Sequence, residues 1–154
     1  MIAALLAALA CAATPIHYEP LPQSGSLSGI PWVQGSPVRH GIFGILFGYD
    51  AELGTNFAFY THGISPDGRV QKVLWVVRNR YAAGSIVIRG REIGGTATFR
   101  NRFWEVGDAS AEPAKGYEYS SHINLPHAGC WRLNVQSGRA KATFVVRGDR
   151  KSVV

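Results

Sequence analysis

With 154 residues and an apolar content of 46%, the chain is long enough for one domain with a single core, without metals or disulfides to hold it together. Charged residues make up only 17% of the chain and glycines number 18, a composition that favours a turn-rich β protein over a helical or disordered one. The net charge of +6 favours anionic partners through long-range attraction.

The N-terminal segment, residues 1–13, is interpreted as a signal peptide or lipobox region. Its apolar run is too short for the ~20 residues of a membrane-spanning helix, but it fits the ~7–15 residues of a signal-peptide core. Small residues permit cleavage after Ala12 or Ala13, whereas Leu9-Ala10-Cys11 is similar to a lipobox in which Cys11 is lipidated. We favour the lipoprotein interpretation, and expect an exported protein that touches the membrane through a lipid anchor only.

Both forms of processing remove Cys11 from disulfide chemistry, so a bond between Cys11 and Cys130 is not expected. Cys130 is interpreted as a small buried hydrophobic residue at the start of its strand. A catalytic thiol assisted by His127 is the alternative, although the sequence identifies no third group to orient that pair.

Residues 14–37 are rich in Pro, Ser and Gly and predict a tether that runs into an irregular lead-in. Trp32 and Val33 are expected to make the first contact with the core. The folded domain is predicted over residues 38–148, followed by a solvated tail at 149–154.

Alternating apolar residues predict strands throughout this domain, beginning over residues 41–49. Ser65-Pro66-Asp67-Gly68 is a turn signal in front of a long apolar strand over 70–78. Three consecutive strands are expected over 117–125, 131–135 and 139–147, with chain reversals between them. The pattern predicts an all-β antiparallel β-sandwich of immunoglobulin-like type, with a small β-barrel as the alternative.

Several short runs give the chain a family resemblance over roughly residues 62–147. They are Ser65-Pro66-Asp67-Gly68, Ile88-Arg89-Gly90-Arg91, Gly116-Tyr117, Leu125-Pro126, Gly129-Cys130-Trp131 and Phe144-Val145-Val146. In these runs, above all the Pro-x-x-Gly-Cys-Trp motif, the chain resembles a family of uncharacterised bacterial proteins that are secreted or lipid-anchored. Trp75-Val76-Val77-Arg78 departs from that pattern, which has a more aromatic segment there. The resemblance implies an extracytoplasmic location and a β fold, and no chemistry.

Three Arg-x-Arg pairs recur at equal spacing, at positions 78/80, 89/91 and 100/102. In an antiparallel meander the first and third pairs would share one edge, and the middle pair would lie at the opposite edge. The candidate anionic-ligand patch is therefore Arg78, Arg80, Arg100 and Arg102. The alternative is that these arginines only protect strand ends from aggregation.

Catalytic and metal motifs are weak in this sequence. His122 and His127 are the best metal ligands that it offers, but their spacing fits no tight-loop or helical site. No carboxylate pair, nucleophile elbow or phosphate loop is present. We therefore expect a protein that is not an enzyme and carries no cofactor.

The sequence thus predicts a binding or structural module of the bacterial cell envelope. Its expected partner is an anionic envelope polymer, a carbohydrate or a protein, and not nucleic acid. The competing hypothesis is a periplasmic metal-binding factor or hydrolase that uses His122, His127 or Cys130. An arginine cluster that faces solvent without partners would favour the anionic ligand.

Overall fold

The structure is a computed structural model that describes residues 11–21, 29–78, 80–108 and 117–150. Residues 1–10, which hold most of the N-terminal apolar run, lie outside the described residues. So do residues 109–115, the second half of the loop after Trp104, and the tail from residue 151. Within the described part of the chain, no helix is long and apolar enough to cross a membrane.

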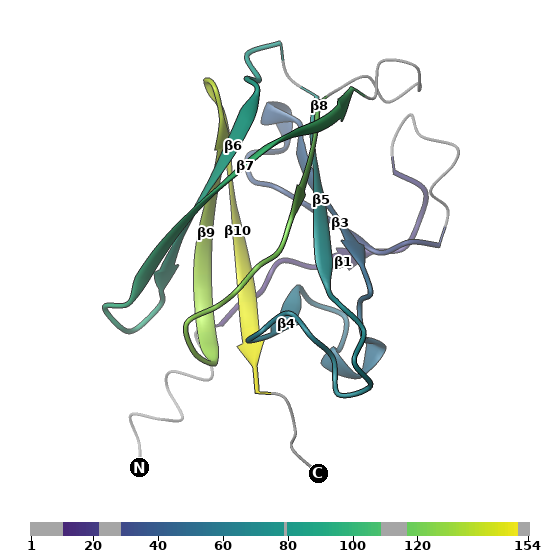
Figure 1. The fold of residues 1–154 in the computed structure, drawn as a ribbon, viewed down its shortest axis with the longest axis vertical. Helices are drawn as coiled ribbons and strands as arrows, with labels where there is room; N and C mark the ends of the chain where they lie inside the picture. Colours follow the sequence, from purple (N-terminus) through teal and green to yellow (C-terminus); the bar gives the residue numbers. More distant parts are fainter. Residues whose placement is uncertain (1–10, 22–28, 79, 109–116, 151–154) are drawn as a thin grey trace.

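Strands dominate the described chain, so the all-β prediction is confirmed (Figure 1). The strands are β1 (Ile16–His17), β2 (Trp32–Gln34), β3 (Ile42–Phe47), β4 (Ala58–Tyr60), β5 (Lys72–Val77), β6 (Ser85–Glu92), β7 (Thr98–Asp108), β8 (Tyr117–Ser121), β9 (Gly129–Ser137) and β10 (Ala140–Asp149). Two short 3-10 helices, η1 (Val38–His40) and η2 (Ala51–Leu53), lie in the connections.

All ten of these strands join one sheet, in the order β1-β2-β3-β5-β8-β7-β6-β9-β10-β4. The sheet curls into a half-barrel, with β3 and β5 on one side and β6, β9 and β10 on the other (Figure 1). Only β4 runs parallel to its partner, β10. The pairing is therefore continuous from one side of the curl to the other.

The three predicted C-terminal strands are present as β8, β9 and β10, but the first two do not form a hairpin. β8 pairs with β5 and β7, whereas β9 pairs with β6 and β10. The segment between them runs across the end of the curl, where Ile123 and Leu125 are buried and the backbone N–H of Leu125 donates to the carbonyl of Thr61. Apolar residues in the turn thus carry the chain across the core instead of reversing it.

Large aromatic residues fill the inside of the curl. Phe144 of β10 lies against Trp75 of β5, with ring centroids 5.0 Å apart, and against Phe57, at 6.3 Å. Trp131 and Tyr119 are fully buried beside them. These contacts join strands from both sides of the sheet into one core.

Residues 14–37 differ from the predicted tether, because their described parts belong to the domain. Leu21 and Trp32 pack against Phe43, Ile45 and Val76 on the outward side of β3 and β5, and form a second apolar cluster. Trp32 and Val33 contact the core as expected, but contact begins earlier, at Ala13. The prolines and glycines of this segment allow an irregular path across the sheet surface.

Replacing Phe144 with alanine tests the aromatic contact between the two sides of the curl. Because the side chain is 1% exposed, we expect Phe144→Ala to lower the free energy of unfolding by about 3–5 kcal/mol. Urea unfolding followed by tryptophan fluorescence measures this change. Lys141→Ala, at an exposed position of the same strand, should change it by less than about 0.5 kcal/mol. Equal losses in both variants would contradict the packing described here.

Candidate functional site

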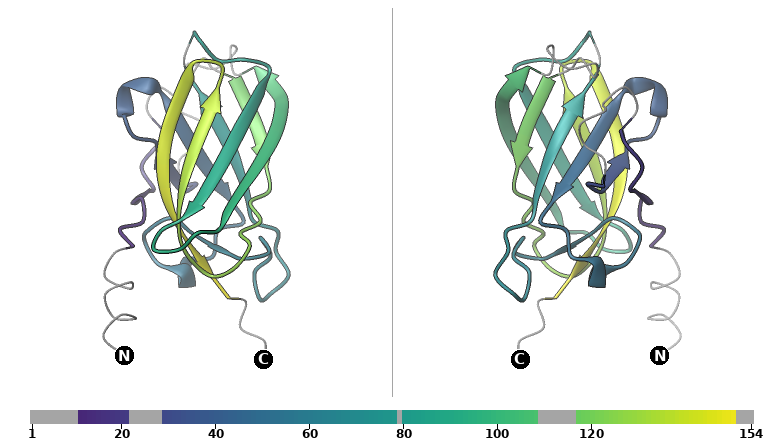
Figure 2. Two further views of the ribbon diagram at one scale, coloured as in Figure 1. Left: turned by 90° about the vertical axis from the view of Figure 1, so that its left-hand side faces the viewer. Right: turned by 90° about the vertical axis from the view of Figure 1, so that its right-hand side faces the viewer.

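No described residue outside the sheet packs over the arginine-rich part of its outward surface. This cationic face lies on β7, β6, β9 and β10, which Figure 2 (left) turns toward the viewer. Its exposed cations are Arg89, Arg91, Arg100, Arg102, Arg132 and Lys141.

The register of the strands brings these cations together. Arg89 on β6 lies directly opposite Arg100 on β7, and Arg91 lies opposite Arg132 on β9. Directly opposed side chains on antiparallel strands are about 4.5–5.5 Å apart at Cβ, so these arginines form two short rows, each of two residues, across neighbouring strands. Like charges at such positions destabilise a sheet, and a face built this way has a reason other than stability.

At the described outward positions of β6, β9 and the first part of β7, no carboxylate balances these charges, whereas Asp149, at the end of β10, pairs with Arg147. The outward positions of β6 and β9, and those of β7 from Thr98 to Val106, include no Asp or Glu. Among the described residues, the four ion pairs involve His17, Arg69, His127 and Arg147, and none of the six cations of the face. The face therefore presents its positive charge to solvent.

Close packing on the inner side holds the central arginines in place. Gly90, between Arg89 and Arg91, lies so close to the ring of Phe99 that an added Cβ would come within 1.9 Å of it. The Phe99 ring in turn lies 5.7 Å from that of Trp131. A side chain at position 90 would displace the Phe99 ring, so glycine at this position lets that ring pack under the arginines.

Three shallow hollows indent the cationic face, and all three are lined by Arg89. The largest, about 440 Å³, lies between η1 and β10 and is also lined by His40, Asn134, Lys141 and Thr143. A second, of about 330 Å³, includes Arg91 and Arg100. A third, of about 220 Å³, includes Arg100 and Arg102. Arg89 thus stands at the centre of the face.

Polar groups around the largest hollow are held by hydrogen bonds. The hydroxyl of Thr143 donates to the side-chain oxygen of Asn134 over 3.1 Å. The Nδ1 atom of His40 donates to the carbonyl of Lys141 over 2.7 Å, which fixes η1 against β10. The hollow therefore has a defined wall on the side opposite Arg89.

One large aromatic side chain borders the cationic face. Trp104 follows Arg100 and Arg102 on the outward side of β7 and is 66% exposed. Val106, the next outward residue, is 62% exposed. An exposed indole beside guanidinium groups provides a flat apolar surface next to hydrogen-bond donors.

The structure divides the predicted patch of Arg78, Arg80, Arg100 and Arg102. Arg100 and Arg102 lie on the cationic face, but β8 separates β5, which ends before Arg78, from β7. The Arg78 guanidinium is half-buried 4.9 Å from the centre of the Phe43 ring, and this burial lowers its pKa. Arg80 stacks on Tyr81 at 4.7 Å.

The predicted arrangement of the three Arg-x-Arg pairs is therefore wrong. The pair at 100/102 lies beside the pair at 89/91, and not beside the pair at 78/80. β5 and β6 are not neighbours in the sheet, whereas β6 and β7 form a hairpin around Gly94-Gly95. That glycine pair lies midway between Arg89 and Arg100, and it was the sequence signal for their register. Arg132 and Lys141 could be added only once β9 was known to lie beside β6.

The weak metal candidates, His122 and His127, are both exposed in the segment between β8 and β9. His127 Nε2 lies 3.5 Å from a carboxylate oxygen of Glu92, and its ring lies against Trp131 with centroids 5.1 Å apart. Within the described residues, no three His, Cys, Asp or Glu side chains gather where they could hold a metal ion.

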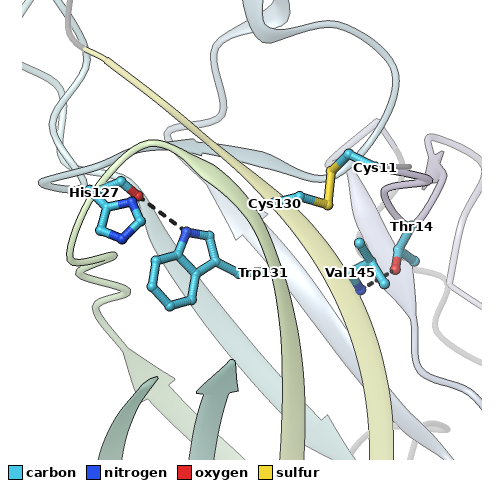
Figure 3. Close-up of a disulfide and its surroundings, with 6 residues drawn as sticks. All are labelled: Cys11, Thr14, His127, Cys130, Trp131 and Val145. Carbon is cyan, nitrogen blue, oxygen red and sulfur yellow. Dashed lines mark hydrogen bonds between the residues drawn. A yellow bond between two sulfur atoms is a disulfide. The ribbon is translucent and has the colours of Figure 1, made fainter. Parts of the chain in front are cut away.

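Cys11 and Cys130 are joined by a disulfide, so the expectation that they do not pair is wrong (Figure 3). The backbone explains the pairing: Thr14 donates from its N–H to the carbonyl of Val145 and accepts from the Val145 N–H through its hydroxyl, both over 2.9 Å. Because β10 lies beside β9, these bonds place Cys11 next to Cys130.

The disulfide decides what chemistry the two cysteines can do. In this state Cys130 is not a nucleophilic thiol. The lipidation of Cys11 stays a prediction, and it excludes the disulfide, because both use the same sulfur atom.

Comparison of the chain with protein-family models, with curated proteins and with solved structures returned no match. The resemblance noted in the sequence therefore stays a prediction.

The disulfide closes a long loop, since its two cysteines are 119 positions apart in sequence, and its removal should lower the stability of the fold. We expect Cys130→Ala, or reduction of the native protein, to lower the free energy of unfolding by about 2–5 kcal/mol, because the unfolded chain gains freedom. Urea unfolding with and without a phosphine reductant measures this change in the free energy of unfolding. In the Cys11→Ala variant, which has no disulfide, the reductant should leave the free energy of unfolding unchanged. If oxidised and reduced protein unfold at the same urea concentration, the bond does not stabilise the fold.

Proposed function

We propose that the protein is an exported binding module of the cell envelope that holds an acidic polysaccharide on its cationic face. The single observation that carries this proposal is the set of exposed arginines on β6, β7 and β9 with no carboxylate between them. Guanidinium groups bind carboxylate, sulfate and phosphate through paired hydrogen bonds.

A polymer fits this face better than a small anion does. The cations are spread over four strands and three shallow hollows, so one small ligand could contact only a few of them. A chain that carries one charge per unit could follow the rows of arginine across the strands. Trp104, at the border of the face, offers a surface on which a sugar ring can stack.

The disulfide supports export, because such bonds form and persist in oxidising compartments. It also favours the secreted or periplasmic form over the lipid-anchored one, since a lipidated Cys11 has no sulfur to share. Of the two architectures expected from the sequence, the continuous curl of the sheet supports the small barrel over the immunoglobulin-like sandwich.

The competing hypothesis, a metal-binding factor or hydrolase, has less support. It would depend on His122, His127 or Cys130, but Cys130 is in a disulfide and His127 packs against Trp131. No specific observation favours this alternative.

Reversing one central charge tests the proposal. Because Arg89 lines all three hollows, we expect Arg89→Glu to weaken binding of polygalacturonate about tenfold or more, equivalent to about 1.4 kcal/mol. Titration calorimetry measures the affinity, and that of the native protein should fall as salt is raised. Lys72→Glu makes the same charge change at an exposed position of β5 and should leave binding unchanged.

Three further probes identify the class of ligand. Neutral dextran should not bind, and Trp104→Ala should weaken polygalacturonate binding without changing its salt dependence. Vesicles of phosphatidylglycerol and single-stranded DNA test the other polyanions. Tighter binding of either, or equal losses in Arg89→Glu and Lys72→Glu, would contradict an acidic polysaccharide as the ligand of this face.

A further inference from the structure

The first described residues of the N-terminal segment, 11–14, are built into the fold. Cys11 is bonded to Cys130 on β9, and Ala13 is 9% exposed. Thr14 bridges β10 and the residue before β4, because its carbonyl accepts from the N–H of Phe57 over 2.7 Å while its own N–H donates to the carbonyl of Val145. Figure 3 shows the disulfide beside the contact between Thr14 and Val145.

This arrangement is incompatible with the processing sites first expected from the sequence. Cleavage after Ala12 or Ala13 would remove Cys11 and with it the disulfide. Lipidation would convert the Cys11 sulfur to a thioether and also prevent the bond. A mature protein with this disulfide must be cut before Cys11.

The sequence provides a suitable cleavage site at that position. Ala8-Leu9-Ala10 places small residues one and three positions before Cys11, within the apolar run of residues 2–13. Small residues at these two positions are what a signal peptidase requires. We propose that the export leader is cleaved between Ala10 and Cys11, and that the new N-terminal cysteine is oxidised onto Cys130.

Both steps balance chemically. Water hydrolyses the peptide bond after Ala10, leaving a carboxylate on Ala10 and an α-amine on Cys11. The thiols of Cys11 and Cys130 then lose two electrons and two protons to the disulfide of an extracytoplasmic thiol–disulfide oxidoreductase, which becomes a dithiol. The resulting bond fixes the new N-terminus to the start of β9.

The test uses the full chain with a C-terminal affinity tag, expressed in a bacterium and purified from the extracytoplasmic fraction. The intact mass should correspond to a chain that begins at Cys11, and reduction should add two hydrogen atoms. A non-reduced peptide map should link the Cys11 peptide to the Cys130 peptide. A mature chain that begins at Ala13 or Thr14, or one that carries a diacylglyceryl group, would overturn the proposal.

A matched pair of variants separates the two cleavage sites. Ala10→Leu puts a large residue directly before Cys11 and should cause the uncut precursor to accumulate, whereas Ala12→Leu, at an exposed position, should mature normally. The reverse pattern would overturn the proposal, because it would place cleavage after Ala12. So would the absence of the protein from the extracytoplasmic fraction.

The proposal depends on export but not on the polysaccharide. Binding to polygalacturonate is measured separately, on the same purified protein. A chain that begins at Thr14 and still binds would reject the cleavage site and leave the proposed function standing. A chain that begins at Cys11 and does not bind would do the opposite.

Discussion

The fold depends on how the second edge of β10 is completed. Its first edge pairs with β9 along its length, but no single strand pairs with the other. Ser36 exchanges two backbone hydrogen bonds with Thr143, Thr14 bonds to Val145, and β4 pairs beyond them. An unpaired strand edge invites aggregation, so these short segments together do what one long strand would do elsewhere. They also connect β10 to the segments beside β1 and β2, at the opposite end of the sheet.

The outward surface of this curl has two unlike halves. Over β3 and β5 the lead-in chain covers the sheet, with Leu21 and Trp32 buried against it. Over β6 and β9 nothing in the described chain covers it, and the outward positions are Arg89, Arg91 and Arg132. A mixture of positive and negative side chains would also prevent aggregation. It would destabilise the sheet less, because opposite charges on neighbouring strands attract one another. A surface of one sign instead raises the local concentration of an anionic ligand, so binding explains this half better than protection of the edge does.

Local features of the fold were predictable and long-range ones were not. Period-two alternation identifies strands such as β9 and β10, because it reflects which face of one strand is buried. It does not say which strands become neighbours, so the reversal after Pro126 was mistaken for a hairpin and Arg78 was grouped with Arg100. The hairpin that opposes Arg89 and Arg100 did have a local signal, in its two turn glycines, as did the hairpin of β9 and β10 around Gly138. The disulfide depends on contacts between residues that are far apart in the sequence, such as Thr14 and Val145, and no local pattern encodes such contacts.

The disulfide and the cationic face share strand β9, and this connects the covalent structure to the proposed function. Cys130 is the second residue of the strand, and Arg132 and Asn134 follow it on the outward side. One end of β9 is therefore bonded to the N-terminal segment, while its other end turns directly into β10. A strand held at both ends keeps its neighbours in register, so the backbone under the arginines is ordered before any ligand arrives. Binding then costs mainly the freedom of the arginine side chains, which is what allows a shallow, open surface to hold a polymer.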